Sequence, residues 1–236
     1  MKEHLELSVV ILCYRAEESI IPFSEKLKEE VSKLTDSFEI VLVGNYLEGS
    51  SDKTPEIIKE IASKDPVFKA ISQVKKGMMG WDVRLGLSES RGNVLCFIDG
   101  DGQFPIESIT TGYKKIKSGE FELVKTYRTK RGDGFKRKLI STVYNAVFKV
   151  MFPSVKARDI NSKPKLFTRA VYERLNLTYD DWFIDAEIMI KISKLGIKFY
   201  EFPIEFKELE TRNSFVNFST ILEFIRNLIS YRLKGR

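Results

Sequence analysis

The chain has 236 residues, 43% of them hydrophobic and 31% charged, which is enough to bury one large core, and we expect a single globular domain. Its net charge of +6 and pI of about 9.1 are compatible with a binding partner that is nucleic acid, anionic lipid or a phosphorylated small molecule, and charge alone does not distinguish among these partners. The sequence has no N-terminal signal region and no apolar run of about 18 residues, which predicts a chain that does not cross a membrane. Cys13 and Cys96 lie in apolar runs with no zinc-type cluster, which fits a reduced, cytoplasmic compartment.

Short apolar runs alternate with amphipathic segments in the first 105 residues. The pattern predicts strands at 7–14, 38–43, 68–73 and 94–98, and helices at 19–34, 54–63 and 81–90. Such alternation is typical of an α/β fold with a mostly parallel sheet and helices on both faces. Ligands of such sheets bind at the carboxyl ends of the strands, where we expect three polar loops, at 14–18, 44–54 and 99–105.

The pattern continues after Pro105 with more irregular spacing. It predicts helices at 106–117, 135–152 and 185–195, strands at 123–127 and 198–206, and a segment at 159–175 that is extended and then helical. The last segment, 218–236, has a wide apolar face with arginines and a lysine elsewhere. Two interpretations stay open for it: a helix that packs on the domain, or an interfacial helix that meets anionic lipid headgroups.

The most informative local pattern is Asp99-Gly100-Asp101, which directly follows an apolar strand. Two carboxylates one residue apart, separated by glycine, can turn toward one oxygen-rich site that suits a hard cation and diphosphate oxygens. A plain turn rich in Asp and Gly is the alternative, because these residues are common in turns for conformational reasons. Taken alone, the pattern favours the plain turn.

Four segments together resemble family 2 glycosyltransferases of the GT-A fold, especially the dolichol-phosphate mannose synthase-like branch. They are the opening strand and turn at 8–18, the strand and DxD-type motif at 94–103, the segment at 159–169 and the DxE-type element at 183–187. The likeness covers nearly the whole chain. It implies a GT-A domain with a nucleotide-sugar-binding half at 1–105, an acceptor half at 106–217 and a C-terminal amphipathic helix at 218–236.

The resemblance implies a set of donor and metal residues. Asp99, Asp101 and Gln103 would hold Mg²⁺ or Mn²⁺, and Gly100 would lie against the donor. Tyr14 and Glu17 belong to the nucleotide-contacting turn, where Arg15 stands in place of the usual asparagine.

The end of the second predicted strand departs from the family pattern, which has an Asp-Asp-Gly-Ser stretch there. Either Glu48 and the two residues after it replace this stretch after an insertion, or Asn45 reads the base, so the nucleotide stays open.

The loop that contains Lys76 and Gly77 stands where the family has a glycine-containing loop. Its glycines predict a close backbone approach to a diphosphate and its lysines offer positive charge. A mere surface loop is the alternative, and Trp81 is then an anchor in the core.

The basic stretch 125–137 resembles the segment that binds acceptor phosphate in polyprenyl-phosphate sugar synthases. Arg128 and Arg137 are predicted to converge on one anion, because guanidinium suits bidentate phosphate contact. A solvated basic loop is the main alternative, and nucleic acid is disfavoured because aromatic residues are sparse here. Arg212 and Ser214 resemble a late loop that closes over the acceptor or the donor.

The predicted reaction is an inverting transfer of a sugar from a nucleoside diphosphate sugar to a polyprenyl phosphate or related lipid-linked acceptor. An ionised phosphate needs no strong base, so Arg128 and Arg137 would position it. A saccharide hydroxyl, the alternative acceptor, needs a base, for which Asp185 is the first candidate and Asp181 the second. An ordinary helix N-cap is the other interpretation of both acidic residues.

Two further function classes remain as alternatives. A sugar nucleotidyltransferase would normally show a glycine-rich first loop, which 13–18 lacks, and a non-enzymatic nucleotide-binding protein would show no transfer. We expect a cytoplasmic protein, at the cytoplasmic face of the membrane if the last helix is interfacial, with no nucleic-acid partner.

Overall fold

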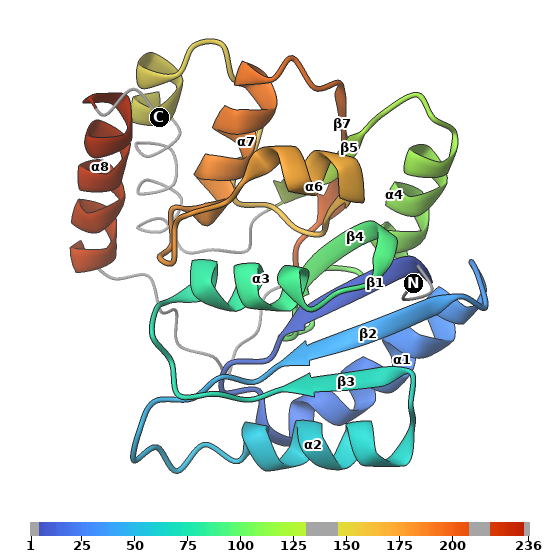
Figure 1. Ribbon diagram of the computed structural model, residues 1–236. Helices are drawn as coiled ribbons and strands as arrows, with labels where there is room; N and C mark the ends of the chain where they lie inside the picture. Colours follow the sequence, from blue (N-terminus) through green and yellow to red (C-terminus); the bar gives the residue numbers. More distant parts are fainter. Residues whose placement is uncertain (1–4, 131–145, 208–217, 234–236) are drawn as a thin grey trace.

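Seven strands form one sheet in the order β3-β2-β1-β4-β6-β5-β7 (Figure 1). The computed structural model describes residues 5–130, 146–207 and 218–233. For Lys130 and for 218–224 it describes the backbone alone. The strands are β1 Leu5–Leu12, β2 Phe38–Val43, β3 Phe68–Ile71, β4 Gly92–Asp99, β5 Leu123–Lys130, β6 Lys165–Thr168 and β7 Phe199–Glu205. Neighbouring strands pair in parallel except at β6, which is antiparallel to both β4 and β5.

The central strands are apolar on both sides because both faces of the sheet are covered. In β1, Val10 faces one core cluster, while Val9 and Ile11 face the other. This period of two explains why the sequence shows a continuous apolar run here. The mostly parallel α/β sheet with two covered faces is thereby confirmed.

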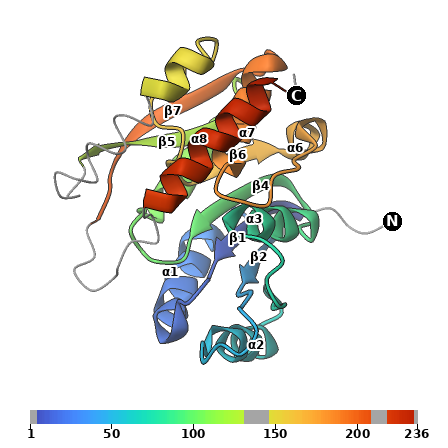
Figure 2. The same cartoon turned by 90° about the vertical axis from the view of Figure 1, so that its left-hand side faces the viewer.

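Helices divide between the two faces (Figures 1 and 2). One face carries α1 Ile20–Ser32, α2 Thr54–Lys64 and α4 Glu107–Lys117, and the other carries α3 Met79–Ser88, α6 Arg169–Leu175, α7 Ile184–Lys194 and α8 Phe218–Leu233. Leu27 and Ile58 belong to the core cluster of Val9 and Ile11. The other cluster, that of Val10, contains Leu87, Ile188 and Leu228. A short 3₁₀ helix, η1 Glu17–Ser19, links β1 to α1.

The structure contains the strands and helices predicted for the described residues, and some of their ends are shifted. β5 runs to Lys130, past the predicted end at 127, because β7 pairs with it as far as Lys130 and Glu205. The first strand ends at Leu12 and leaves Tyr14 in the loop at the carboxyl edge. Most of the helix predicted for 135–152 lies outside the described residues. In the part that is described, 146–151 are helical.

Helix α8 packs on the domain through part of its surface. Leu228 and Tyr231 are buried in the core cluster beside α7, and Asn227 Nδ2 donates a hydrogen bond to Asp181 Oδ2 at 2.6 Å. The packing interpretation therefore holds for this side of the helix. Ile229 and Leu233 remain exposed. Within the parts of the chain that the structure describes, no helix is long and apolar enough to span a bilayer.

Candidate functional site

Three polar loops meet at the carboxyl edge of the parallel strands, as predicted. β1 lies between β2 and β4, and its last residue, Leu12, is in register with Val43 on one side and Asp99 on the other. Two backbone hydrogen bonds extend this contact: Cys13 N–H donates to Val43 O at 2.9 Å, and Gly100 N–H donates to Leu12 O at 3.0 Å. The loops after β1, β2 and β4 therefore lie side by side.

The turn after β4 presents two carboxylates. Asp99 ends the strand with its side chain one quarter exposed, and Asp101 Oδ1 accepts the backbone N–H of Gln103 at 3.0 Å. Gly100 has no space for a side chain, since a Cβ atom there would lie 2.9 Å from Ile11 Cγ2. Gly102 has a φ of +73°, which favours glycine. The fold thus specifies both glycines of the motif.

Gln103 is tied to the chain after β7. Its Nε2 donates to Lys207 O at 3.1 Å, and Lys207 N–H donates to Gln103 O at 3.0 Å. Carboxylates and an amide oxygen are the hard donors that Mg²⁺ and Mn²⁺ accept, with phosphate oxygens to complete the shell. The residues present fit such an ion, although the described residues contain no group of three or more His, Cys, Asp or Glu side chains placed to hold one.

A buried lysine lies beside Asp99. Lys163 Nζ is 3.3 Å from Asp99 Oδ2 and 3.4 Å from Asp185 Oδ2, and its side chain is 5% exposed. Burial alone works toward a lower pKa of Lys163, but Asp185 and Asp99 together raise this pKa above the ordinary lysine value. The ammonium group therefore links the turn after β4 to helix α7.

A second buried lysine, Lys165, binds Asp185 from the other side. Its ammonium group contacts Asp185 Oδ1 and donates to Ser162 O at 3.0 Å. Burial lowers the pKa of Lys165 to about 8, although Asp185 works in the opposite direction. Burial also works toward a higher pKa of Asp185, but the two lysines bring it below the ordinary aspartate value.

These contacts change the interpretation of Asp185. A general base works best with a pKa near the operating pH and within reach of the acceptor. Asp185 is 2% exposed, has a lowered pKa and is held by Lys163 and Lys165. Its geometry is that of a buried counter-ion. It is not the N-cap of α7 either, since that position belongs to Phe183.

The second candidate base, Asp181, is half-buried. Its Oδ1 accepts the backbone N–H of Phe183 at 2.8 Å and its Oδ2 accepts from Asn227, which anchors α8. Burial raises the pKa of Asp181 despite these hydrogen bonds. The contacts to Phe183 and Asn227 show that Asp181 joins the start of α7 to α8.

Arg128 forms a bidentate ion pair with Asp159. Its Nε lies 2.7 Å from Asp159 Oδ2, its Nη2 lies 3.0 Å from Asp159 Oδ1, and the guanidinium carbon lies 5.2 Å from the centre of the Phe206 ring. The sequence motif included Asp159, but nothing in the spacing identified this pairing. The other predicted acceptor residues, Arg137, Arg212 and Ser214, lie outside the described residues.

A third buried lysine supports the same region. Lys125 Nζ donates to Thr126 O at 2.7 Å and pairs with Glu201 Oε1 at 2.9 Å, and burial lowers the pKa of Lys125. The Thr126 hydroxyl lies 2.6 Å from that of Ser162. The basic stretch, predicted to bind acceptor phosphate or to be a solvated loop, thus starts with an internal lysine.

The loop after β1 has an unusual backbone. Arg15 and Glu17 have φ values of +53° and +47°, and Glu17 N–H donates to Thr54 Oγ1 at 2.9 Å. Asparagine tolerates this left-handed region better than arginine does. Two cations flank the Tyr14 ring: Lys75 Nζ lies 4.7 Å from its centre and Arg15 Cζ lies 5.3 Å away. Strained backbone of this kind often accompanies function.

Asn45 and Asp82 form a buried polar contact below the loops. Asn45 Nδ2 donates to Asp82 Oδ1 at 2.8 Å, and Asn45 Oδ1 accepts from Gln73 N–H at 2.9 Å. Lys75 forms an ion pair with Asp82, although burial, the largest influence, raises the pKa of Asp82. The sequence predicted that the lysines of this loop offer charge to a diphosphate, and it did not indicate the ion pair between Lys75 and Asp82. Glu48, the other candidate for contact with the base, is exposed in the turn at 47–49.

The glycines near the start of α3 allow the backbone at 179–181 to pack closely against this loop. A Cβ atom at Gly77 would lie 2.9 Å from Asp180 O, and one at Gly80 would lie 2.5 Å from Tyr179 O. Met78 N–H donates to Asp180 O at 2.7 Å. The predicted room for a diphosphate beside these glycines is therefore filled by backbone at 179–181. Lys76 is exposed on this loop.

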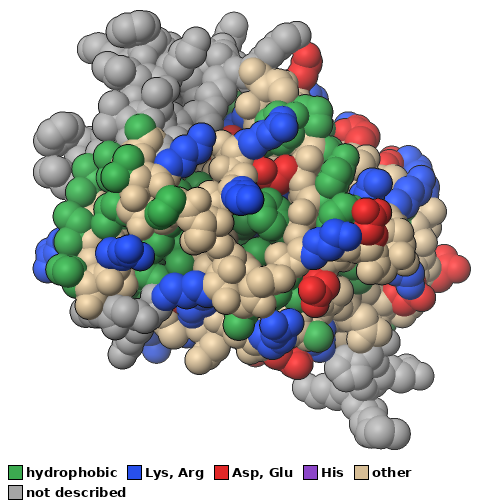
Figure 3. Space-filling model, turned by 90° about the horizontal axis from the view of Figure 1, so that it is seen from above, with side chains coloured by type: hydrophobic (Ala, Val, Ile, Leu, Met, Phe, Trp, Pro, Cys, Tyr) green, Lys and Arg blue, Asp and Glu red, His purple; other side chains and the backbone are tan. Residues whose placement is uncertain are grey.

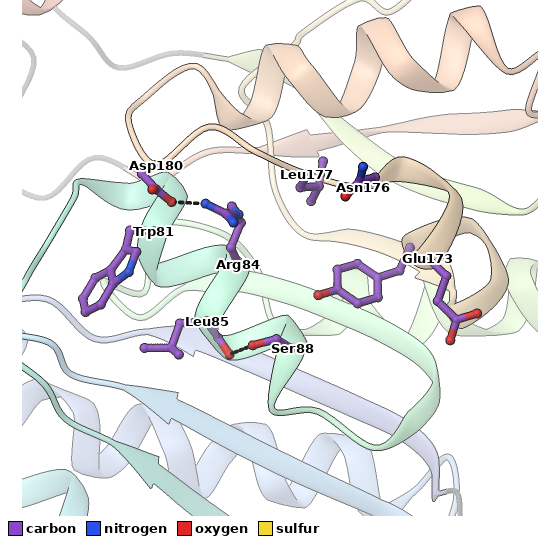
Figure 4. Close-up of a pocket in the computed structure, with 9 residues that line it drawn as sticks. Trp81, Arg84, Leu85, Ser88, Glu173, Asn176, Leu177 and Asp180 are labelled. Atoms are coloured by element: carbon purple, nitrogen blue, oxygen red, sulfur yellow. Dashed lines mark hydrogen bonds and ion pairs between the residues drawn. The ribbon is translucent and has the colours of Figure 1, made fainter.

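A cavity of about 460 Å³ lies between α3 and α6 (Figure 4). Trp81 and Arg84 reach it from α3, and Arg84 forms an ion pair with Asp180 at its rim. Trp81 is half-buried here and is not a fully buried anchor of the core. None of the lining residues comes from the loops at 14–18, 44–54 or 99–105. The cavity is thus separate from the candidate site.

The Asp185 contacts predict a large loss of stability in Asp185→Asn. The substitution leaves Lys163 and Lys165 buried without their shared counter-charge, which costs about 3–5 kcal/mol in the free energy of unfolding. Asp180→Asn is the matched control, because its ion pair with Arg84 is exposed and contributes about 1 kcal/mol or less. Urea denaturation of both variants measures the difference. Equal, small losses would show that the buried pairs do not stabilise the fold.

Comparison with known proteins identifies the family. The model of "Glycosyl transferase family 2" matches residues 8–180. A dolichyl-phosphate β-glucosyltransferase of Trichomonas vaginalis is 27% identical over 249 residues, covering 98% of this chain and 74% of that protein. An undecaprenyl-phosphate 4-deoxy-4-formamido-L-arabinose transferase of Photorhabdus laumondii is 31% identical over 144 residues, covering 60% of this chain and 43% of that protein. Across curated relatives the chain spans between 33% and 74% of their length.

Solved structures agree on the fold. Glucosyl-3-phosphoglycerate synthase from Mycobacterium tuberculosis, crystallised with Mn²⁺, UDP-glucose and phosphoglyceric acid, superposes with a TM-score of 0.72 at 17% identity. The match covers 97% of this chain and 80% of that one, and it shows a GT-A fold. Together with the family match over residues 8–180, this establishes that the chain belongs to glycosyl transferase family 2.

Proposed function

We propose that this protein transfers a sugar from a nucleoside diphosphate sugar to a polyprenyl phosphate or a related lipid-linked acceptor, with inversion and with a divalent metal. The observation that carries the proposal is the pair Asp99 and Asp101 at the end of β4, beside the Tyr14 loop, in a chain of this family. One relative is named as a dolichyl-phosphate β-glucosyltransferase and another as an undecaprenyl-phosphate 4-deoxy-4-formamido-L-arabinose transferase. A structural neighbour was crystallised with Mn²⁺ and UDP-glucose.

The donor is assigned to the edge formed by β1, β2 and β4. Asp99, Asp101 and Gln103 would hold Mg²⁺ or Mn²⁺, which supplies Lewis-acid neutralisation of the departing diphosphate. Tyr14, Glu17 and Gly100 would lie along the nucleotide, and Glu48 and Lys76, both exposed, would approach its base and diphosphate. Asn45 now has a supporting role, because both ends of its amide already hold Asp82 and Gln73.

The acceptor's phosphate is assigned to Arg128, with Arg137, Arg212 and Ser214 as further contacts. Asp159 fixes the guanidinium of Arg128 on one side and Phe206 lies against it. A guanidinium that is already held in place loses less conformational entropy when an anion binds. Arg128 would therefore orient the attacking phosphate oxygen in line with the leaving group.

The state of Asp185 favours a phosphate over a saccharide hydroxyl as acceptor. A hydroxyl needs a base, and Asp185 is a poor one because two lysines hold it and lower its pKa. Asp181 is occupied by Phe183 and Asn227. A polyprenyl phosphate is ionised at neutral pH and attacks without a base.

A transfer assay tests the proposal. With Mn²⁺ or Mg²⁺, the protein should move label from a nucleoside diphosphate sugar to polyprenyl phosphate, and a chelator should stop the reaction. Asp99→Asn and Asp101→Asn should each lower kcat/KM by about a hundredfold or more, because the ligand charge acts on the departing diphosphate. The urea midpoint of Asp101→Asn should stay near the parent value, whereas Asp99→Asn also removes one of the two carboxylates beside buried Lys163 and should lower the midpoint, by less than Asp185→Asn does. Full transfer activity in both variants would refute the metal role.

One surface supports a peripheral membrane contact as part of this proposal. Val150 and Leu233 are about four-fifths exposed (82% and 80%), and Ile229 is also exposed. Lys149, Arg226 and Arg232 are exposed on the same two segments, 146–151 and α8. Phe152, which directly follows the first segment, packs against Tyr231 of α8. Hydrophobic and basic side chains gather at the left of Figure 3, the side where α8 lies in Figure 1. This combination suits an anionic lipid surface.

Vesicle binding checks the membrane contact. Val150→Glu/Leu233→Glu should lower co-sedimentation with anionic vesicles at low salt by about tenfold or more, because it removes apolar contact and adds repulsion. Nucleotide binding should not change. Ile21→Glu, at an exposed apolar position on α1 across the sheet, is the matched control and should sediment like the parent. The membrane proposal fails if the parent protein does not sediment with these vesicles.

A further inference from the structure

Within the part of the chain that the structure describes, Lys163 forms ion pairs with both Asp99, at the end of β4, and Asp185 of α7. We propose that Lys163 is a built-in counter-ion of the metal-binding carboxylates, which holds Asp99 while the site is empty of metal and makes divalent-metal affinity depend on the donor diphosphate. The inference rests on the proposed metal role of Asp99 and assigns a new function to Lys163.

The distances show that Lys163 is shared between its partners. Its Nζ lies 3.3 Å from Asp99 and 3.4 Å from Asp185, both longer than the usual charge-assisted hydrogen bond of about 2.7–2.9 Å. Lys165 makes the tighter contact with Asp185. Asp185 therefore keeps a cation of its own when Lys163 moves toward or away from Asp99.

Burial strengthens the electrostatic interaction between the Lys163 ammonium group and charges at Asp99. The Lys163 side chain is 5% exposed and that of Asp185 is 2% exposed, so water screens the ammonium charge little. A divalent cation on Asp99 must share that carboxylate with the ammonium group, and the two positive charges repel. A donor diphosphate brings negative charge to the same place and offsets both cations. Metal and donor should therefore bind together, each increasing the affinity for the other.

Binding of Mn²⁺, followed by electron paramagnetic resonance, tests this role without any turnover. Lys163→Met should bind Mn²⁺ alone about tenfold or more tightly than the parent. The reason is that Mn²⁺ and the ammonium group share one carboxylate, and their repulsion lowers the Mn²⁺ affinity of the parent by about this factor even at the dielectric constant of water. Lys163→Arg, which keeps the charge, should resemble the parent. Lys114→Met removes the same charge from an exposed position on α4 and should also resemble the parent.

The parent protein provides a second measurement that needs no variant. UDP should raise its affinity for Mn²⁺ by about tenfold or more, and this enhancement should shrink in Lys163→Met. Equal affinity for Mn²⁺ alone in the parent and Lys163→Met, or no enhancement by UDP in the parent, would overturn the role of Lys163. Failure of every protein to bind Mn²⁺ even with UDP would overturn the metal site and this inference together.

Discussion

The arrangement of the site depends on charge balance inside the protein. Lys125, Lys163 and Lys165 are buried between the sheet and α7, and each has a carboxylate partner: Glu201 for the first and Asp185 for the other two. Buried charges are costly unless they are paired and hydrogen-bonded, so these pairs restrict how the segment at 159–165 lies against β5 and α7. The position of Asp99 follows from the same network because Lys163 reaches it directly.

This network joins two parts of the domain. The edge at the ends of β1, β2 and β4, where we propose that the donor binds, is built by parallel strands and their loops, whereas α7 and the segment at 159–165 lie in the part that we propose for the acceptor. Antiparallel β6 pairs with both β4 and β5 and connects these parts through backbone hydrogen bonds. Within the second part, Asp159 ties Arg128, at the end of β5, to the segment at 159–165 that carries Lys163. A phosphate acceptor held by Arg128 would therefore be fixed relative to the carboxylates of the donor edge.

The sequence predicted the features that arise from local pattern. The apolar runs of β1 and β4 and the two glycines that follow Asp99 and Asp101 are visible without a structure, because strand burial and turn conformation restrict which residues occur at these positions. The same pattern placed three loops at one edge, since parallel strands end together. The resemblance to the family rested on the segments 8–18 and 94–103 together with 159–169 and 183–187, and the family match over residues 8–180 confirms the family.

Features that arise from contacts between distant residues were not predictable. Asp185 looked like a candidate base because the segment 183–187 resembles the DxE-type element of the family, but the two lysines that hold it are 20 or more positions away in the sequence. Gly77 and Gly80 looked like a phosphate loop, yet they make room for the backbone at 179–181. Arg128 and Asp159 each matched a motif, and only the fold shows that they form a pair.

The central claim is that Asp99 and Asp101 hold a metal against the donor diphosphate while Asp185 remains a buried counter-ion. A crystal structure with Mn²⁺ and UDP, with the anomalous signal of manganese mapped, tests it most directly. The account predicts the manganese peak between these two carboxylates and the diphosphate, with the contact between Lys165 and Asp185 unchanged. A peak away from Asp99, or Asp185 turned out toward the ligand, would contradict it.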